Sequence, residues 1–182
     1  MKKYLLLIVT VFYSFFLSAQ EDIVIKGTKK ITKEATPKEV VDALNAKFPD
    51  ANAVVYYKAP SSGVENGWVV TEDDKLSDQD EVDYYTISFK REGLKYYGLY
   101  KKDGTLLKSK IEQNNATLPA PVASSLENVA KDHPGYTIKS KTYYKNQNYE
   151  KTQEYYEIVA EKGNTVKRLY YQADGKLLKV KG

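Results

Sequence analysis

A short phrase occurs twice in the chain, and this internal repetition constrains the fold more than any other feature of the sequence. DGTLLK begins at Asp103, and DGKLLK begins at Asp174. The same offset places Tyr85 on Tyr156 and Tyr100 on Tyr171. A register that is kept over such a length predicts a tandem duplication of one supersecondary unit.

The repeat divides the chain into two predicted units, residues 36–113 and residues 114–182. The YYK segments that begin at Tyr56 and Tyr143 lie further apart than the two copies of the phrase do, so the first unit carries an insertion, which we place at residues 60–82. Residues 21–35 precede the first unit and are either a linker or an added edge strand.

Each unit opens with the signals of an amphipathic helix. In TPKEVVDALNAKFP, Thr36 can cap the helix, Pro37 suits the first helical position, and Glu39 completes a capping box. Apolar residues then recur at helical spacing, and a proline ends the segment. The second copy, LPAPVASSLENVAKDHPG, has the same apolar stripe and ends at Pro134. We therefore expect one helix at the start of each unit.

The rest of each unit is predicted to form antiparallel strands. VDYYTISF and EYYEIVA alternate between two faces with a period of two. KREGLK, KKDGT, EKGNT and QADGK provide turns that contain glycine, and Asp-Gly is a strong hairpin signal. The duplicated phrase is therefore predicted to be a hairpin corner.

The N-terminal segment, residues 1–20, has the layout of a secretory signal peptide. Lys2 and Lys3 precede an apolar run from Leu5 to Leu17, and small residues follow at Ser18 and Ala19. The run is shorter than the roughly 20 apolar residues that span a bilayer. We expect a cleaved signal at residues 1–20, a periplasmic or secreted protein, and no membrane span after the signal is removed. The chain has no cysteine, so its fold must form without disulfides.

The helix-and-strand pattern resembles a known family. A proline-initiated helix that ends in FPDA or HPGY, followed by YYxI and Y(x)3G(x)LL, occurs twice behind a candidate signal peptide. This arrangement resembles the PepSY-like, β-lactamase-inhibitor-like proteins of Bacteroidetes over about residues 36–182. The resemblance implies an α+β fold: a tandem duplication of a helix packed on a three- to four-stranded antiparallel sheet, with one continuous curved sheet and both helices on one face.

The resemblance also implies a binding role. In the inhibitor from which the family takes its name, the open face of the sheet and its protruding loops hold the target enzyme. A peptidase-inhibitory role is suspected for PepSY domains. The expected partner is therefore an envelope or secreted protein such as a peptidase or hydrolase.

The sequence offers no arrangement that is typical of an enzyme. His133 is the only histidine and cysteine is absent, so common thiol, triad and zinc chemistries lack their residues. No serine lies in a G-x-S-x-G elbow, and no glycine-rich phosphate loop occurs. Without Lys2 and Lys3 of the signal segment, the formal net charge falls from +4 to +2, which is too small to favour nucleic acid as a partner. We expect a non-catalytic protein without cofactor or metal.

Two surfaces are candidates for partner binding. The insertion holds the only tryptophan, Trp68, beside an acidic run, and could enter a partner's cleft, fold back on the sheet, or hold calcium through Asp78, Asp80 and Glu81. The second surface is a tyrosine-rich sheet face, since the chain has 17 tyrosines. By alternation this face carries Tyr84, Tyr97, Tyr155 and Tyr170, with Tyr56 or Tyr143.

The tyrosine face admits more than one use. An uncovered set of rings would mark an interaction site, whereas rings that cover one another across strands would only stabilise the sheet. The leading prediction is protein binding through this face and the Trp68 loop. The alternatives are binding of a glycan or small ligand by the tyrosines, or a structural role in the envelope.

Overall fold

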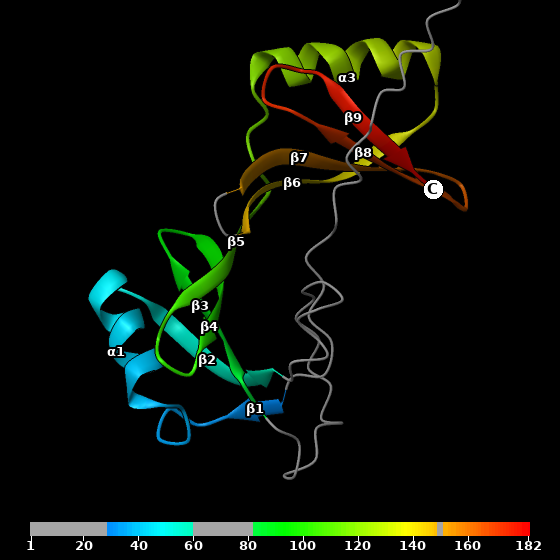
Figure 1. Ribbon diagram of the computed structural model, residues 1–182. Coiled ribbons are helices and arrows are strands. Elements are labelled where there is room, and N and C mark those ends of the chain that lie inside the picture. Colours follow the sequence, from blue (N-terminus) through cyan, green and yellow to red (C-terminus); the bar gives the residue numbers. More distant parts are fainter. Residues whose placement is uncertain (1–28, 60–81, 149–150) are drawn as a thin grey trace, which may run out of the picture.

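A computed structural model describes residues 29–59, 82–148 and 151–182 of the chain (Figure 1). The predicted signal peptide at residues 1–20, Trp68 and the candidate calcium ligands Asp78, Asp80 and Glu81 lie outside these described residues.

The described strands form one antiparallel sheet in which the order in space follows the order in the chain (Figure 1). The strands are β1 (Lys29–Ile31), β2 (Asn52–Ala59), β3 (Tyr84–Arg91), β4 (Leu94–Lys101), β5 (Leu106–Asn114), β6 (Thr137–Asn148), β7 (Lys151–Lys162), β8 (Thr165–Tyr171) and β9 (Leu177–Lys181). The helices of the described part are α1 (Lys38–Lys47) and α3 (Ala120–Asp132).

The predicted α+β fold class is wrong. We expected an α+β fold in which two helix-on-sheet units share one curved sheet, but the described part of the chain is mostly a nine-stranded antiparallel sheet, with two helices of only 10 and 13 residues. The two predicted units meet within this sheet. β5 pairs with β6 from Lys108↔Asn148 to Asn114↔Thr142, so the ladder of hydrogen bonds runs through the expected boundary at residue 113. The protein is mostly β structure.

Helix α1 packs on β2, β3 and β4. Its buried residues Val40, Val41 and Leu44 contact a cluster that includes Ile87, which is fully buried. The spacing of these helical residues puts them on one side of the helix, as the sequence predicts. The predicted cap is wrong, because the Thr36 hydroxyl donates a hydrogen bond to the carbonyl of Thr32 at 3.0 Å and α1 has no side-chain cap.

Helix α3 packs on β7 and β8 less closely. Val122 is its one buried residue within the described structure, and it contacts a cluster of Ile158, Ala160, Leu169 and Tyr171. Leu126 and Val129, nearer the helix C-terminus, are only partly buried. The C-terminal half of α3 therefore leaves space above the sheet.

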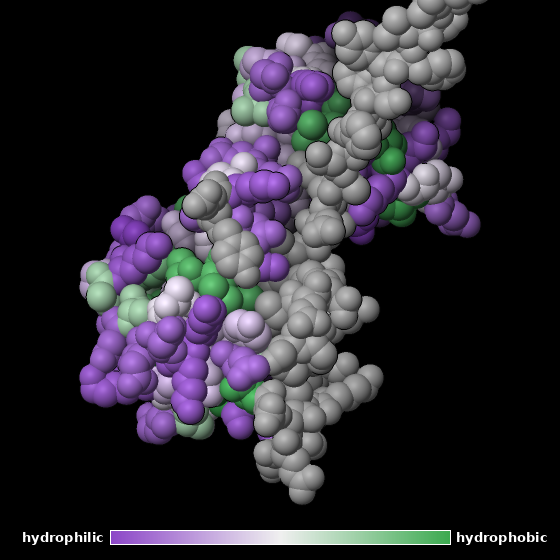
Figure 2. All heavy atoms as spheres, viewed as in Figure 1, coloured by the Kyte–Doolittle hydropathy of each residue, from purple (hydrophilic) through white to green (hydrophobic). Residues whose placement is uncertain are grey.

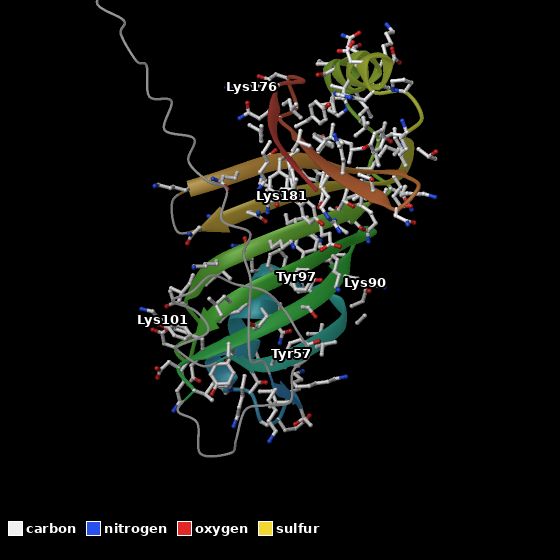
Figure 3. All side chains as sticks on the ribbon, turned by 90° about the vertical axis from the view of Figure 1, so that its right-hand side faces the viewer. Tyr57, Lys90, Tyr97, Lys101, Lys176 and Lys181 are labelled. Carbon is white, nitrogen blue, oxygen red and sulfur yellow. The ribbon has the colours of Figure 1, made fainter. Side chains whose placement is uncertain are left out.

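Strand register places both helices on the same side of the sheet. Directly paired residues share a face, and the pairs lead from Phe89 through β4, β5 and β6 to Glu154 on β7. Glu154 alternates onto the same face as Ile158, which lies under α3, whereas Phe89 belongs to the cluster under α1. We call this side the helix face and the opposite side the helix-free face. Figure 3 is viewed from the helix-free side, with α1 behind the strands.

The two copies of the duplicated phrase form the same turn. In the first, the amide of Gly104 donates to the carbonyl of Lys101 at 3.0 Å, and the amide of Thr105 donates to Asp103 Oδ1 at 2.9 Å. In the second, Gly175 donates to Gln172 at 3.0 Å, and Lys176 donates to Asp174 Oδ1 at 2.9 Å. The backbone hydrogen bond to Asp103 lowers the pKa of that carboxyl group.

Candidate partner-binding face

The helix-free face carries a row of tyrosine and lysine side chains that crosses six adjacent strands. We call it the tyrosine–lysine row. From β4 to β9, each strand contributes one member: Tyr97, Lys110, Tyr144, Tyr155, Tyr170 and Lys179. Tyr97 pairs directly with Lys110, Tyr144 with Tyr155, and Tyr170 with Lys179. The other two steps are diagonal, since Lys110 pairs with Asn146 and Tyr170 with Glu157.

Ring and ammonium groups contact one another along this row. The ring centroids of Tyr144 and Tyr155 lie 5.2 Å apart, and those of Tyr155 and Tyr170 lie 5.8 Å apart. Lys110 Nζ lies 4.7 Å from the Tyr144 centroid and 5.9 Å from that of Tyr97. Such tilted rings and cation–π contacts favour a fixed arrangement of side chains.

Lysines lie over the rings at both ends of the row. Lys95 Nζ is 4.8 Å from the Tyr97 centroid, and Lys179 and Lys181 are 4.4 Å and 5.9 Å from the Tyr170 centroid. Figure 3 shows Tyr97 and Lys181 on this side of the molecule. The tyrosine rings of the row therefore lie close to the sheet, and lysine ammonium groups lie over the rings at its ends.

A buried carboxylate lies beside the row. Glu157 Oε1 accepts hydrogen bonds from Arg168 Nη1 at 2.8 Å and from the Tyr170 hydroxyl at 3.3 Å. Burial, and then the nearby charge of Glu157, raise the pKa of Tyr144 well above its ordinary value. Tyrosine is neutral at physiological pH even at its ordinary pKa of about 10, so no phenolate offsets the positive charge of the lysines.

One polar atom beside the row lacks a partner within the described structure. Asn146 is 5% exposed, and its Nδ2 donates to the Tyr155 hydroxyl at 3.4 Å, but its Oδ1 accepts no hydrogen bond from described residues. A buried acceptor of this kind costs free energy until it is paired. It lies on the same face as the row, since Asn146 pairs with Lys110.

The structure divides the tyrosines that the sequence singled out. Tyr84, Tyr97, Tyr155 and Tyr170 lie on the helix-free face, because their pairs include Lys101, Lys110, Tyr144 and Lys179. Tyr56 and Tyr143 lie on the helix face instead. Tyr56 belongs to the core under α1, and Tyr143 contacts Tyr156 at 5.2 Å and donates to Glu154.

The members of the row that sequence reasoning missed are Tyr144 and the lysines. Tyr144 follows Tyr143 directly, and the choice between the two depends on register, which the pairing Tyr144↔Tyr155 fixes. The lysines had a readable signal. Lys95 lies two residues before Tyr97 and so shares a face with it, and Lys108 and Lys110 share a face of the next strand in the same way.

The rings of the row are covered to a large extent. Tyr97, Tyr155 and Tyr170 are 8%, 6% and 4% exposed. Their contacts with one another and with lysines are those of rings that shield each other across strands. What this face presents beyond the sheet is therefore lysine as much as tyrosine.

The described surface is otherwise hydrophilic over most of the view in Figure 2, where hydrophobic residues form small separate patches.

Among the described residues, no group of three or more acidic or histidine side chains is placed to hold a metal ion. A search of the described helices for one long and apolar enough to cross a membrane finds none.

Known proteins resemble this chain in structure but not detectably in sequence. No family model and no curated protein sequence matches it. A DUF2874 family protein from Bacteroides uniformis is similar with a TM-score of 0.50 at 15% identity, covering 80% of this chain and 88% of that one. A second DUF2874 family protein, from Bacteroides ovatus, gives 0.50 at 16% identity, covering 80% and 86%.

A third similar structure is a BLIP-like protein from Bacteroides fragilis. Its TM-score is 0.50 at 17% identity, and the match covers 80% of this chain and 85% of that chain. At such identities the likeness shows the fold alone. The expected resemblance to β-lactamase-inhibitor-like proteins is thus supported at the level of fold, and membership of the PepSY family stays a prediction.

Proposed function

We propose that this chain is a non-catalytic protein-binding module of the periplasm and that its partner docks on the helix-free face, over the tyrosine–lysine row. The observation that carries the proposal is the row itself. Six adjacent strands each contribute one tyrosine or lysine to this row, which lies on the side of the sheet that neither described helix covers.

The chemistry of the row favours a protein with an acidic surface. Tyrosine is a frequent hot-spot residue at protein interfaces, but Tyr97, Tyr155 and Tyr170 are largely covered, so the lysines of the face would make most of the contact with a partner. Here the contacts within the row already fix the rings, so docking would lose little side-chain entropy. Lys95, Lys179 and Lys181 give the face a positive charge that complements carboxylates, whereas Lys110 Nζ already lies 3.8 Å from Glu112 Oε2.

The location and the class of partner rest on separate arguments. The charged, apolar and small-residue segments within residues 1–20 support export. The name of the Bacteroides fragilis structure, BLIP-like, supports a search among hydrolases and peptidases. A sugar is a poorer candidate, because it would stack on open ring faces and lysine ammonium groups already lie over Tyr97, Tyr144 and Tyr170.

Charge reversal on the helix-free face tests the proposal. The double variant Lys95→Glu, Lys181→Glu changes two exposed lysines that lie over the ends of the row. Proteins captured from an envelope fraction by the wild-type chain are identified by mass spectrometry, and their affinity for each variant is measured by surface plasmon resonance. We expect at least about tenfold weaker binding by the double variant, and binding that weakens as salt rises.

The matched control is Lys33→Glu, Lys131→Glu, which makes the same change of charge at two exposed positions beside α1 and in α3. This control should bind as the wild type does. Equal loss in both double variants would show a general charge effect, and no loss in either would remove the helix-free face from the proposal.

A further inference from the structure

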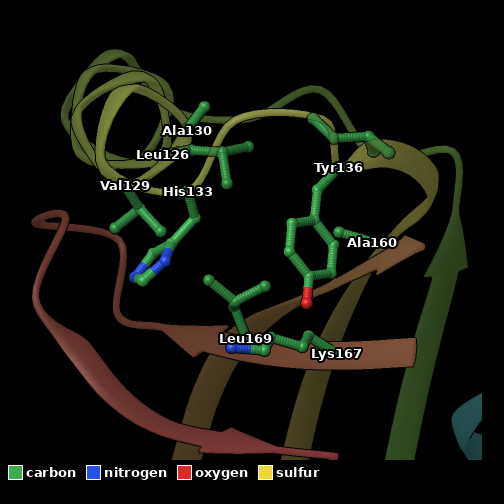
Figure 4. Close-up of a pocket in the computed structure, with 9 residues that line it drawn as sticks. Leu126, Val129, Ala130, His133, Tyr136, Ala160, Lys167 and Leu169 are labelled. Atoms are coloured by element: carbon green, nitrogen blue, oxygen red, sulfur yellow. The ribbon is translucent and has the colours of Figure 1, made fainter. Parts of the chain in front are cut away.

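A pocket lies on the helix face between the C-terminal half of α3 and the sheet (Figure 4). Its volume is about 120 Å³. Apolar side chains from α3, β6, β7 and β8 make most of its wall, and three polar or charged side chains complete it. The apolar residues are Leu126, Val129, Ala130, Ile138, Ala160 and Leu169, and the others are His133, Tyr136 and Lys167.

We propose that this pocket binds a small aromatic monocarboxylate, with the ring between α3 and the sheet and the carboxylate at Lys167. The proposal is independent of partner binding on the helix-free face, since it concerns the opposite side of the sheet.

The first half of the chain fills the corresponding place with its own rings. At the end of α1, the Phe48 ring lies 4.9 Å from that of Phe89 and 5.8 Å from that of Tyr96, and Phe89 and Tyr96 stack at 5.0 Å with planes 8° apart. These three rings close the space between the C-terminal end of α1 and the sheet.

The second half has smaller or charged residues at the corresponding positions. The offset that relates the two copies of the phrase places Phe89 on Ala160 and Tyr96 on Lys167. Both are cross-strand pairs, Phe89↔Tyr96 in the first half and Ala160↔Lys167 in the second. Phe48, the residue that ends α1, corresponds to His133, which ends α3. The replacement of phenylalanine by alanine leaves a gap the size of a ring, and α3, with one buried residue, does not close down to fill it.

The size of the pocket suits one aromatic ring. A cavity of about 150 Å³ that is lined by aliphatic side chains takes up benzene, and the pocket here is about 120 Å³ with an aliphatic wall. Its polar rim allows a ligand with one substituent that reaches out of the apolar part.

The charge at the rim selects an anion. Lys167 Nζ lies 5.5 Å from the Tyr136 centroid, and Lys162 Nζ lies 5.9 Å from it. Lys162 donates to the carbonyl of Pro134 at 3.0 Å. Within the described structure, Lys167 makes no ion pair with a carboxylate, and none of the nine lining residues is acidic. A ligand carboxylate would supply the missing counter-charge.

Titration of the full mature chain with phenylacetate, and with phenylacetamide as its neutral counterpart, tests the inference. Methyl resonances of Leu126, Val129 and Leu169 are followed by NMR. We expect saturable shifts with phenylacetate, with a Kd on the order of 1 mM or tighter for a ligand of about ten non-hydrogen atoms. Phenylacetamide should bind at least about fivefold more weakly because it cannot pair with Lys167.

Two substitutions separate the ring site from the charge. Ala160→Phe restores the side chain found at the corresponding place in the first half and should weaken phenylacetate binding at least about tenfold. Lys167→Gln should remove the preference for the acid over the amide and leave binding of the amide unchanged. Lys33→Gln, at an exposed position beside α1 in the first half, makes the same charge change and should alter neither value.

Absence of saturable shifts in the wild-type chain would overturn the inference, as would undiminished binding by a folded Ala160→Phe variant. If that variant does not fold, Lys167→Tyr takes its place, since it introduces the ring that Tyr96 provides in the first half and removes the charge as well. Binding of phenylacetate by this second variant at wild-type strength would equally overturn it.

Discussion

Replacing Gly104 with alanine is expected to lower the free energy of unfolding by about 2–4 kcal/mol, a large part of the stability of an ordinary domain. Gly104 has φ +83°, a left-handed conformation that costs an alanine about 1–2 kcal/mol. A Cβ at this position would also lie 2.6 Å from the carbonyl oxygen of Glu39, in the first turn of α1. Because that neighbour is backbone, the turn and the helix must move apart.

Gly93→Ala is the matched control for this prediction. Gly93 has a similar φ of +76°, but a Cβ there would meet no atom within 4 Å. Its substitution should cost only the left-handed conformation, about 1–2 kcal/mol. The difference between the two variants in urea denaturation isolates the contact between turn and helix, and equal losses would show that the contact contributes nothing.

Gly175→Ala extends the same test to the second copy of the phrase. Gly175 has φ +88°, and a Cβ there would lie 2.6 Å from the carbonyl oxygen of Pro121, in the first turn of α3. We expect a loss like that of Gly104→Ala. The phrase that occurs twice in the sequence thus forms, in each copy, a turn that packs against the N-terminal turn of a helix.

This contact shows what the sequence could and could not predict. Asp-Gly identified both hairpin corners, because that dipeptide fixes a local backbone conformation. Each glycine lies against the first turn of a helix, but several strands lie between that helix and the glycine along the chain. No local sequence pattern could therefore predict the contact. The fold class was wrong for a different reason: the two predicted helices are short, at 10 and 13 residues, whereas the described strands make up most of the structure as one nine-stranded sheet.

The tyrosine face was predictable in part for a related reason. Tyr84, Tyr97, Tyr155 and Tyr170 alternate within clear strands, and their face follows from the period of two. The pairs Tyr84–Tyr85 and Tyr155–Tyr156 also carry a ring on each side of the sheet, but Ile87 and Ile158 alternate with one ring of each pair and mark the buried face. No isoleucine follows Tyr56–Tyr57 or Tyr143–Tyr144 in this way, so the pattern cannot say which ring faces the helices. In β2, the register shift between Asn52 and Val55 adds to this ambiguity.

The pocket under α3 was not predictable from one copy of the pattern. It exists because Ala160 and Lys167 occupy positions that Phe89 and Tyr96 fill in the first half. The sequence shows the offset between the copies. Only the packing of Phe48 against those two rings shows that residues at these positions fill the space between helix and sheet. A substitution between repeats becomes meaningful once the contacts of one copy are known.

Alkaline pH is expected to destabilise the fold through its buried tyrosines, most clearly through Tyr100. Tyr100 is 2% exposed in the core under α1, and burial raises its pKa to about 12. An unfolded tyrosine has a pKa of about 10. Below pH 10 both states hold the proton and the full stability is present; between about pH 10 and 12 the unfolded state releases the proton while the folded state keeps it. Stability therefore falls as pH rises, by roughly 3 kcal/mol for this group alone.

Tyr100→Phe removes this proton and is the variant that measures the effect. Urea denaturation at intervals between pH 9 and pH 12 should show the wild type losing stability relative to Tyr100→Phe by roughly 3 kcal/mol across that window. Lysines also lose charge there, but they do so equally in both chains, so their contribution cancels from the difference. Parallel curves for the two chains would mean that Tyr100 ionises in the folded state as it does in the unfolded one, and that the core under α1 admits water to its hydroxyl group.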